Sequence, residues 1–527
     1  MISRTPVLRL ALRAATAASA VIVAAAGLGG AVAASASVPP AGARANPYSP
    51  AAGHPYRHGV LPTLVSQRAM TRWASQRAVP AASRENLSYG GGGHGNGVTS
   101  GHEKVYLVFY GSQWGTAHTN SHGDLTLSGD PNGAAPYLQE LFKGLGTGGE
   151  RWSGVMTQYC DGVAYGATSC PANSYHVAYP SGGALAGVWA DEGSASPSAA
   201  TGHQLGTVAI AAAHHFGNNT KASNRDAQYV ILSPTGTHPD GFNTSSGQFC
   251  AWHDDSADPN LPAGPVIASL DVAFTNLPYV TDAGPSCGEN FVNGGAAGVL
   301  DGASIVEGHE YAETITDQYP AFGWTNTYTG GEETADLCAW NPPGGTGGTN
   351  DLTLPTGTFA MQSTWSNRTS GGQCSFRQPV QASNWVRNGG FEAGPLKYWT
   401  TSGSVATVTR AHSGRYAARL GKITPTKGSS SIAQTFTARG TGVSFWYNVN
   451  CPDTVAVAWA TATLTDNTAH TSVTLLAKTC VAAGGWRQAS GTVIAGHSYT
   501  LKLISHDDGD TSKGDGAYLR VDDVISR

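Results

Sequence analysis

Charge is scarce in this chain of 527 residues: Asp, Glu, Lys and Arg make up 12% of it, and the formal net charge is −5. We therefore expect no basic surface that would bind nucleic acid or an anionic membrane. The motif C-x-x-C is also absent, which argues against a thiolate zinc site or a thioredoxin-like redox centre. A length of this size favours two folded domains with tails over one compact core.

Long apolar runs are missing after the first 36 residues. Within residues 1–36, arginines precede an Ala/Val/Leu-rich run, and small residues follow it at Ala33 and Ala36. This pattern predicts a secretory signal peptide. A membrane anchor is the alternative, but the Ala and Gly content makes the run weakly apolar. No later segment is long enough to span a bilayer, so we expect a secreted, extracellular protein without membrane contact after cleavage.

The chain has eight cysteines, an even number, and in an exported protein such a count predicts disulfide bonds. Pairing of neighbours along the chain is the simplest arrangement, because it needs no bridge between domains. A free catalytic cysteine would leave an unpaired partner, which argues against a cysteine nucleophile. The disulfide candidates are Cys160, Cys170, Cys250, Cys287, Cys338, Cys374, Cys451 and Cys480.

The amino-acid composition and residue pattern change twice along the chain after residue 36. Residues 37–97 are rich in Ala, Pro and Gly, which predicts a disordered tether or a removable pro-segment. Residues 98–380 mix strand-like and helical patterns, which predicts an α/β (mixed) domain. Residues 384–527 show short alternating runs between turns, which predicts an all-β sandwich of jelly-roll type. The α/β pattern rests on expected strands at 104–111, 227–234 and 266–280 and expected helices at 136–145, 150–159, 202–217 and 301–320.

The expected helix 301–320 contains EGHEYAETITD, with the pattern H-E-x-x-E. His309 and Glu313 are four residues apart, so on a helix both face one side and can share a metal ion. Glu310 lies close enough to take a proton from a metal-bound water, as in the H-E-x-x-H motif of zinc peptidases. The bland alternative is a solvated helix face. The apolar neighbours favour a partly buried helix, where several uncompensated carboxylates would be costly without a cation.

A catalytic metal usually has a third protein ligand and one open position. The downstream segment GGEETADLCAW supplies Glu333 and Asp336 beside Cys338, whose disulfide would hold the loop in place. Asp317 continues the acidic stripe as a further candidate ligand. One imidazole and two carboxylates suit Zn²⁺, with Ca²⁺ as a competitor. His253 in FCAWHDD could reach the site, although a hydrogen bond within a loop is the simpler interpretation.

Several ordered stretches resemble the bacterial branch of the exordium, or phosphate-induced, protein family. The stretches are KVYLVFYGSQW, AQYVILSP with GQFCAWH, and EGHEYAETITD followed by EETADLC. The resemblance implies a metallopeptidase-like domain with His309, Glu313, Glu333 and Asp336 as metal ligands and Glu310 as the base. This chain departs from the family pattern T-D-P, because Gln318 follows Asp317.

The segment NWVRNGGFEAGPLKYWT and the closing YLRVDDVIS resemble jelly-roll carbohydrate-binding modules of secreted bacterial enzymes. That resemblance implies a structural Ca²⁺ held by Glu392 and Asp522, with Asp523 adjacent, and a polysaccharide or cell-wall glycan as partner. Aromatic rings can stack on sugar rings, although most aromatics of a sandwich belong to its core. The aromatic candidates are Trp399, Trp446, Tyr447, Trp459 and Trp486.

The sequence thus predicts a secreted zinc metallopeptidase of the H-E-x-x-E type, acting on a peptide substrate and attached to glycan by its C-terminal module. The alternative is a non-catalytic extracellular wall- or matrix-binding protein in which the same acids hold a structural Ca²⁺. The patterns leave catalysis, metal identity, substrate and glycan specificity, pro-segment processing and oligomeric state open.

Overall fold

The computed structural model describes residues 46–76, 86–93, 96–171, 174–267, 269–326, 331–368, 371–381, 383–394 and 396–527. The expected signal peptide lies outside these residues. Two hydrophobic cores are present, one drawn from residues 56–376 and the other from residues 386–524. Among the described residues, no helix is long and apolar enough to cross a membrane.

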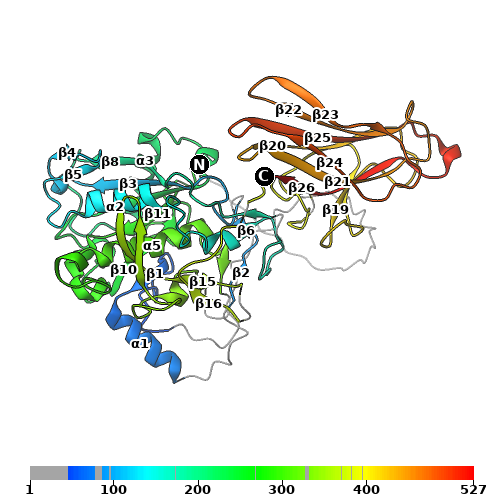
Figure 1. Cartoon of the computed structure of the whole chain (residues 1–527). Coiled ribbons are helices and arrows are strands. Elements are labelled where there is room, and N and C mark those ends of the chain that lie inside the picture. Colours follow the sequence, from blue (N-terminus) through cyan, green and yellow to red (C-terminus); the bar gives the residue numbers. More distant parts are fainter. Residues whose placement is uncertain are drawn as a thin grey trace, which may run out of the picture. The chain divides into compact units, whose positions relative to one another are not determined.

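A six-stranded mixed sheet forms the centre of the first region (Figure 1). The three strands β9, β3 and β8 run parallel to one another and to β11, whereas β10 and β1 are antiparallel to their neighbours. The almost unbroken burial of β3 and β9 matches their apolar, β-branched sequences, as expected for strands covered on both faces. In spatial order the strands are β1 (His58–Pro62), β10 (Phe249–Asp255), β11 (Ala273–Leu277), β9 (Ala227–Leu232), β3 (Lys104–Tyr110) and β8 (Leu185–Asp191).

The prediction of a disordered tether over 37–97 is wrong for residues 46–76. This segment forms β1, an edge strand of the central sheet, and then helix α1 (Leu64–Ser75). Four of the five β1 residues are buried, because HGVLP pairs with β10. The Ala- and Pro-rich composition concealed a short apolar run with its own sheet partner.

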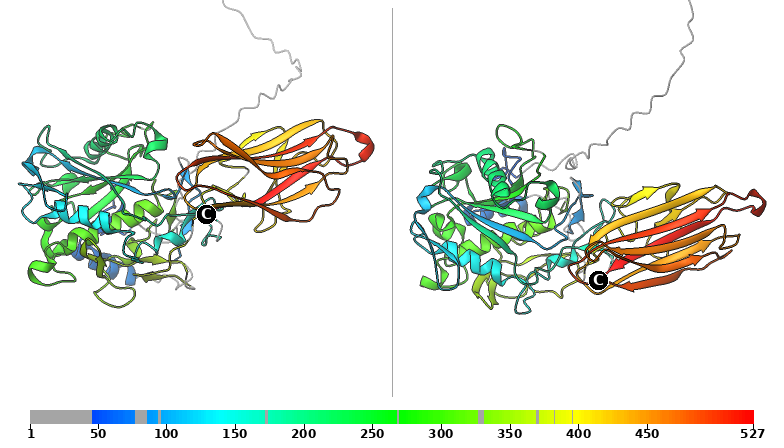
Figure 2. Two further views of the ribbon diagram at one scale, coloured as in Figure 1. Left: turned by 45° about the horizontal axis from the view of Figure 1, so that its top comes forward. Right: turned by 90° about the horizontal axis from the view of Figure 1, so that it is seen from above.

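Helices cover both faces of the sheet (Figures 1 and 2). On one face, Gly206 of α3 packs against Phe274 of β11. On the other face, His253 of β10 meets α5. The helices besides α1 are α2 (Ala134–Gly144), α3 (Gly202–His215), α4 (Lys221–Asn224) and α5 (Asp301–Thr316).

Three further parts of the structure differ from the sequence-based prediction. Residues 150–159 form only a short 3-10 turn, η3 (Met156–Gln158), although their spacing predicts a helix. The segment FCAWHDD is not a loop but strand β10. Helix α5 ends at Thr316, before Pro320, because the Asp317 carboxylate accepts hydrogen bonds from the backbone of Ala321, Phe322 and Gly323.

Short two-stranded ribbons accompany the central sheet. The pairs are β2 (Ser88–Tyr89) with β12 (Trp324–Thr325), β4 (Ala117–Thr119) with β5 (Leu125–Leu127), β6 (Cys160–Asp161) with β7 (Tyr175–His176), β13 (Asn350–Leu354) with β14 (Gly357–Met361), and β15 (Thr364–Ser366) with β16 (Gln373–Ser375). Strand β14 of one of these ribbons contacts α5.

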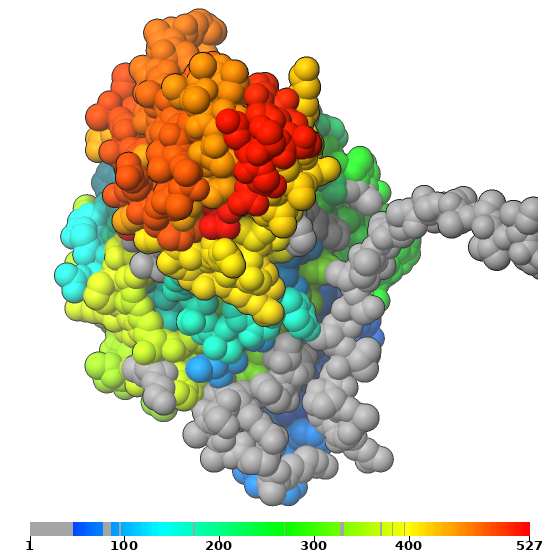
Figure 3. All heavy atoms as spheres, turned by 90° about the vertical axis from the view of Figure 1, so that its right-hand side faces the viewer, coloured from blue at the N-terminus to red at the C-terminus, as the bar shows by residue number. Residues whose placement is uncertain are grey.

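The second region is the expected β-sandwich, built from two five-stranded antiparallel sheets (Figure 2). The first sheet has the order β17 (Thr400–Ser402), β20 (Gly428–Thr437), β25 (Ser498–Asp507), β22 (Trp459–Asp466) and β23 (Thr471–Thr479). The second has the order β18 (Val405–Val408), β19 (Ala417–Leu420), β26 (Tyr518–Ser526), β21 (Gly442–Asn450) and β24 (Arg487–Thr492). Burial alternates along β25, which is the pattern of a strand with one face toward a core. The loop with η8 (Thr511–Lys513), in red, lies on the face that Figure 3 shows.

Four disulfide bonds join neighbours along the chain, in the pairing that the sequence favours. The bonds are Cys160–Cys170, Cys250–Cys287, Cys338–Cys374 and Cys451–Cys480, and no free cysteine remains. Disulfides persist in oxidising compartments, so this set fits an extracellular protein.

Candidate metal centre

Helix α5 is buried along its whole length and carries a row of ionisable side chains. His309 Nε2 lies 3.1 Å from Glu313 Oε2, as expected for residues one turn apart. Glu310 is adjacent in sequence, and its side chain is also fully buried. The expected geometry of the H-E-x-x-E motif is therefore present on this helix.

A loop containing η7 (Asp336–Cys338) adds a second carboxylate. Glu313 Oε1 accepts hydrogen bonds from the backbone amides of Ala335, at 3.1 Å, and Asp336, at 2.8 Å. These bonds bring Asp336 Oδ1 to 3.6 Å from His309 Nε2. The Cys338–Cys374 disulfide closes the loop. His309, Glu313 and Asp336 thus present three ligand atoms close enough together to hold one metal ion.

The orientation of His309 is fixed by Gln362. His309 Nδ1 lies 3.2 Å from Gln362 Oε1, which can only accept a hydrogen bond. The amide nitrogen of Gln362 donates to the carbonyl of Ala335, which fixes which end of the amide faces the imidazole. Nδ1 therefore carries a proton. Nε2 faces the carbonyl oxygen of Gly59, which also can only accept, so Nε2 holds a proton as well until a cation displaces it.

His253, on β10, forms a second group with residues of α5 and the loop. Its Nδ1 lies 3.1 Å from Glu310 Oε2 and 3.8 Å from Glu313 Oε2, and its Nε2 lies 3.6 Å from Glu333 Oε1. Glu313 therefore belongs to both groups, which meet on either side of it. Sequence reasoning underrated His253, because the chain places it about 56 residues before the motif and only the sheet brings the two together.

The centre contains buried polar atoms without hydrogen-bond partners. They are His253 Nε2, Glu310 Oε1, Glu313 Oε2 and Glu333 Oε2. Burying such atoms is costly unless a proton or a cation compensates them. Because four such atoms converge from a helix, a strand and a loop, the donor set fits a bound cation.

The pKa values of these groups also indicate that their charges are not compensated. Burial, together with the nearby Glu313, raises the pKa of Glu310 well above its ordinary value. Burial and neighbouring acids do the same to Glu333 and Asp336. Burial alone would lower the pKa of His309, but Glu313 and Asp336 raise it to about 9. Without a cation, this pocket must therefore hold protons that a metal ion would displace.

The backbone of β1 lies directly against these groups. The carbonyl oxygen of Gly59 is 3.2 Å from His309 Nε2. A Cβ atom at Gly59 would lie 2.0 Å from Glu313 Oε2 and 2.3 Å from His253 Cε1. Only glycine fits at this position. Sequence patterns give no signal for this contact, because Gly59 is 250 residues from His309.

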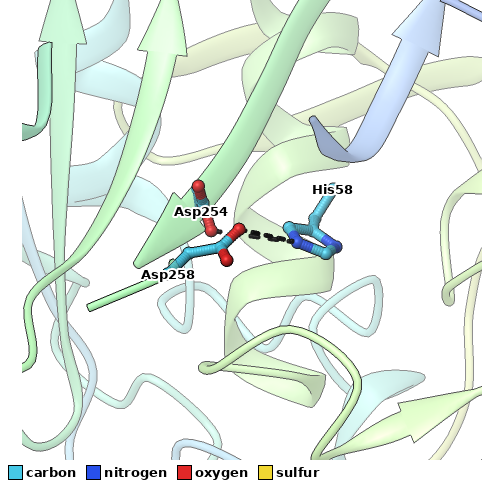
Figure 4. Close-up of side chains that lie close together, drawn as sticks. All are labelled: His58, Asp254 and Asp258. Atoms are coloured by element: carbon cyan, nitrogen blue, oxygen red, sulfur yellow. Dashed lines mark ion pairs between the residues drawn. The ribbon is translucent and has the colours of Figure 1, made fainter. Parts of the chain in front are cut away.

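A separate group is formed by His58, which precedes Gly59 in the chain, with Asp254 and Asp258 (Figure 4). His58 Nε2 is 3.4 Å from Asp258 Oδ2 and 3.9 Å from Asp254 Oδ1. Figure 4 shows both carboxylates facing the imidazole of His58. The group links β1 to β10 and to the loop that follows it.

The predicted site residues separate into three sets. His309, Glu313 and Asp336 lie together, with Glu310 beside them. Glu333 lies near His253, on the other side of Glu313. Asp317 does not join either group, because its carboxylate accepts three backbone hydrogen bonds. Burial raises the pKa of Asp317 to about 8.

The two acids expected to hold Ca²⁺ in the sandwich contact one loop, residues 412–416. Glu392 Oε1 accepts hydrogen bonds from the amides of Arg415 and Tyr416. Asp522 Oδ2 accepts from the amides of His412 and Ser413. Among the described residues, the clusters of three or more potential ligands do not include either acid. The Ca²⁺ site stays a prediction.

Two groups of partly exposed aromatic rings mark the sandwich, one on each sheet. His412 stacks on Trp446 of β21 at 3.8 Å between ring centroids, and Trp486 stands edge-on to His412 at 5.7 Å. On the other sheet, Trp459 stacks with His506 and accepts Lys478 over its ring at 3.9 Å. Trp399, in contrast, is buried in the core.

No family model matches the chain, and no curated protein matches it. The resemblance to exordium proteins therefore stays a prediction. Among solved structures, the chain is similar to the module TmCBM61 in complex with β-1,4-galactotriose, at 19% identity and a TM-score of 0.22 over 27% of this chain and 97% of that one. A family 16 carbohydrate-binding module matches at 13% identity and a TM-score of 0.21, over 27% of this chain and 98% of that one. The CBM22-1 xylan-binding domain of Paenibacillus barcinonensis Xyn10C matches at 17% identity and a TM-score of 0.19, over 26% and 92%.

Proposed function

We propose that the first region is a metal-dependent peptidase and that the sandwich attaches it to glycan. The observation that supports the peptidase most strongly is the convergence of two histidines and four carboxylates, nearly all fully buried, with several of their atoms unpartnered. A structural core would not collect such groups without compensation, because each uncompensated charge is expensive to bury.

His309, Glu313 and Asp336 are the proposed metal ligands. Ligands at about 2.0–2.1 Å from a tetrahedral Zn²⁺ are about 3.3 Å apart. The separations of His309 Nε2 from Glu313 Oε2, 3.1 Å, and from Asp336 Oδ1, 3.6 Å, are close to that value. One histidine and two carboxylates suit zinc, and the oxygen-rich set also admits harder ions.

A bound metal would polarise the substrate carbonyl and lower the pKa of a coordinated water. In the proposed reaction Glu310 takes the proton from the attacking water and delivers it to the leaving amine. His253 is the positioning residue, because its Nδ1 holds Glu310 Oε2 at 3.1 Å and leaves Oε1 without a hydrogen-bond partner. The raised pKa of Glu310 would make it a stronger proton acceptor once a bound cation has ionised it.

The sandwich is proposed to bind polysaccharide through the group of His412, Trp446 and Trp486. Aromatic planes suit the apolar faces of sugar rings. The stacked pair of His412 and Trp446 holds the ring of Trp446 in place, and Trp486 stands at a steep angle beside it. A rigid, partly exposed platform of this kind loses little conformational entropy on binding.

The peptidase proposal is tested by metal analysis and peptide hydrolysis with wild type and Glu310→Gln. Because Gly59 lies against the centre, hydrolysis is measured on the full-length chain and after proteolytic cleavage between Gln76 and Asn86. We expect one metal per chain in both proteins and a loss of hydrolysis of about 10²–10⁴-fold in the variant, the usual contribution of a general base.

The matched control is Glu103→Gln, which makes the same change at another buried carboxylate without hydrogen-bond partners, outside the centre. It should retain metal and activity. Hydrolysis that Glu310→Gln leaves unchanged, or the absence of bound metal in wild type, would refute the proposal.

A structural metal in a non-catalytic wall- or matrix-binding protein is the second candidate. The observation in its favour is the Gly59 carbonyl, which adds an oxygen next to His309 Nε2. A structural Ca²⁺ is closed by six to eight oxygens, whereas a catalytic site keeps an open position. Metal-bound coordinates would distinguish the two by the number of oxygen ligands and by whether solvent reaches the ion.

A further inference from the structure

Strand β10 would be the edge of the central sheet if β1 were absent, since the sheet order begins β1-β10. An exposed edge presents unpaired amides and carbonyls to any extended peptide. His253 lies on β10, so a peptide paired with this strand runs past the candidate metal centre. In this structure the position is taken by residues 58–62 of the same chain.

The carbonyl oxygen of Gly59 is positioned as an oxygen ligand of the centre would be. This oxygen lies 3.2 Å from His309 Nε2, a separation close to the two between His309 and the proposed carboxylate ligands. The oxygen is thus where a substrate carbonyl would stand beside the metal. A side chain at Gly59 would collide with Glu313 and His253, so the fit depends on a bare backbone.

Contacts on both sides of Gly59 hold the strand in place. On one side, Arg57 Nε lies 2.7 Å from Asp240 Oδ2, and His58 faces Asp254 and Asp258 (Figure 4). On the other side, the carbonyl of Pro62 accepts a hydrogen bond from the indole of Trp340 at 2.6 Å. The segment is anchored by side chains that flank the centre, while only its backbone touches the centre itself.

We infer that β1 is a resident, substrate-like strand that closes the centre, and that β10 is the strand on which extended peptide substrates bind after β1 leaves. The inference rests on the proposed function for its second half. It names the substrate class as extended peptides, antiparallel to β10, with glycine at the position of Gly59. It also makes release of residues 46–76 the event that opens the site.

The first experiment compares Gly59→Ala with Gly53→Ala by amide hydrogen exchange in the full-length chain. Both glycines have positive φ, +49° and +82°, so both substitutions strain the backbone. A Cβ at Gly53 meets nothing within 4 Å, whereas at Gly59 it meets Glu313 and His253. We expect exchange over residues 57–63 to become at least tenfold faster in Gly59→Ala only. Equal exchange in the two variants would overturn the inference.

The second experiment releases the strand. A full-length variant carries the recognition sequence of a specific protease in place of residues 77–85, and the cut chain is diluted until residues 46–76 dissociate. A fluorescent peptide with the sequence YRHGVLPTLV, residues 56–65, is then added back. We expect it to bind, and an unlabelled peptide with Gly59→Ala to compete at least tenfold more weakly than the unlabelled native peptide.

Hydrolysis measured on the same samples separates this inference from the peptidase proposal. Activity that appears on release and falls when the peptide is added supports both. Peptide binding without any hydrolysis supports the resident strand and refutes the peptidase. Hydrolysis that is equal before and after release, with no binding of the peptide, refutes the resident strand and leaves the peptidase standing.

Discussion

Asp522 of the sandwich and the candidate metal centre of the first region differ in the hydrogen bonds of their buried carboxylates. In the sandwich, both oxygens of Asp522 accept backbone hydrogen bonds, from His412 and Ser413 on one side and from Asp523 on the other. In the first region, Glu310 Oε1 and Glu333 Oε2 are also buried but have no hydrogen-bond partner. Backbone donors stabilise a buried carboxylate, whereas a buried carboxylate oxygen without any donor needs a proton or a cation. The comparison indicates that functional sites are best sought where polar side-chain atoms are buried but lack hydrogen-bond partners.

Metal removal should affect the two regions unequally, and this is the largest effect that we expect. Binding of a metal present at about 1,000 times its Kd stabilises a fold by about 4 kcal/mol. For a region of this size that corresponds to a melting temperature higher by about 6 °C. Calorimetry of the full-length chain should therefore show two transitions. Chelator should lower the melting temperature of the first region and leave that of the sandwich unchanged.

The control for this measurement is Glu313→Gln, which removes the carboxylate shared by both groups of the centre. Its melting profile should be insensitive to chelator. If chelation lowers the sandwich transition instead, the difference between the regions is wrong and the Ca²⁺ predicted at Glu392 and Asp522 is the metal that matters.

The pH dependence of the sandwich should come in part from Asp522. Burial, together with Asp523, raises its pKa from 3.8 to about 7. The folded state then binds the proton more tightly than the unfolded state, so this contribution to stability is complete below about pH 4 and is lost as pH rises to about 7. We expect a loss of roughly 2–3 kcal/mol between pH 5 and pH 8, because each unit of pKa shift is worth about 1.4 kcal/mol.

This dependence is checked by urea unfolding of the sandwich at pH 5 and pH 8. In Asp522→Asn the difference between the two values should shrink, whereas Asp515→Asn, at an exposed position, should keep it. An unchanged difference in Asp522→Asn would show that its backbone donors, rather than burial, dominate the titration.

Glycan binding should depend on the sandwich alone. We expect Trp446→Ala to weaken binding of a cell-wall polysaccharide by roughly fivefold, or about 1 kcal/mol, because aromatic side chains dominate such contact surfaces. Isothermal titration calorimetry measures this loss. Trp459→Ala, on the other sheet, is the matched control and should bind as wild type does. A larger loss of affinity in Trp459→Ala than in Trp446→Ala would show that glycan binds to the sheet that contains β22.

Much of the local structure follows from residue patterns. The apolar run at 104–110, the helix of the H-E-x-x-E motif and the alternating strands after residue 400 lie where their periodicity predicts. The helix expected at 150–159 does not form, because tertiary contacts fix its residues in turns: Trp152 donates to the carbonyl of Gln362, and Tyr159 to that of Trp365. Weak local preference gives way to such contacts.

The sequence by itself determined that His309 and Glu313 share a helix face, because four residues make one helical turn. It also indicated the acidic loop with its cysteine, and the neighbour pairing of disulfides. Only the tertiary structure decided that His253 supports Glu310 and that Glu333 lies on the far side of Glu313. It also placed Gly59 on the centre. These contacts join residues far apart in the chain, and pairing across a sheet follows from the packing of the whole domain rather than from any local pattern.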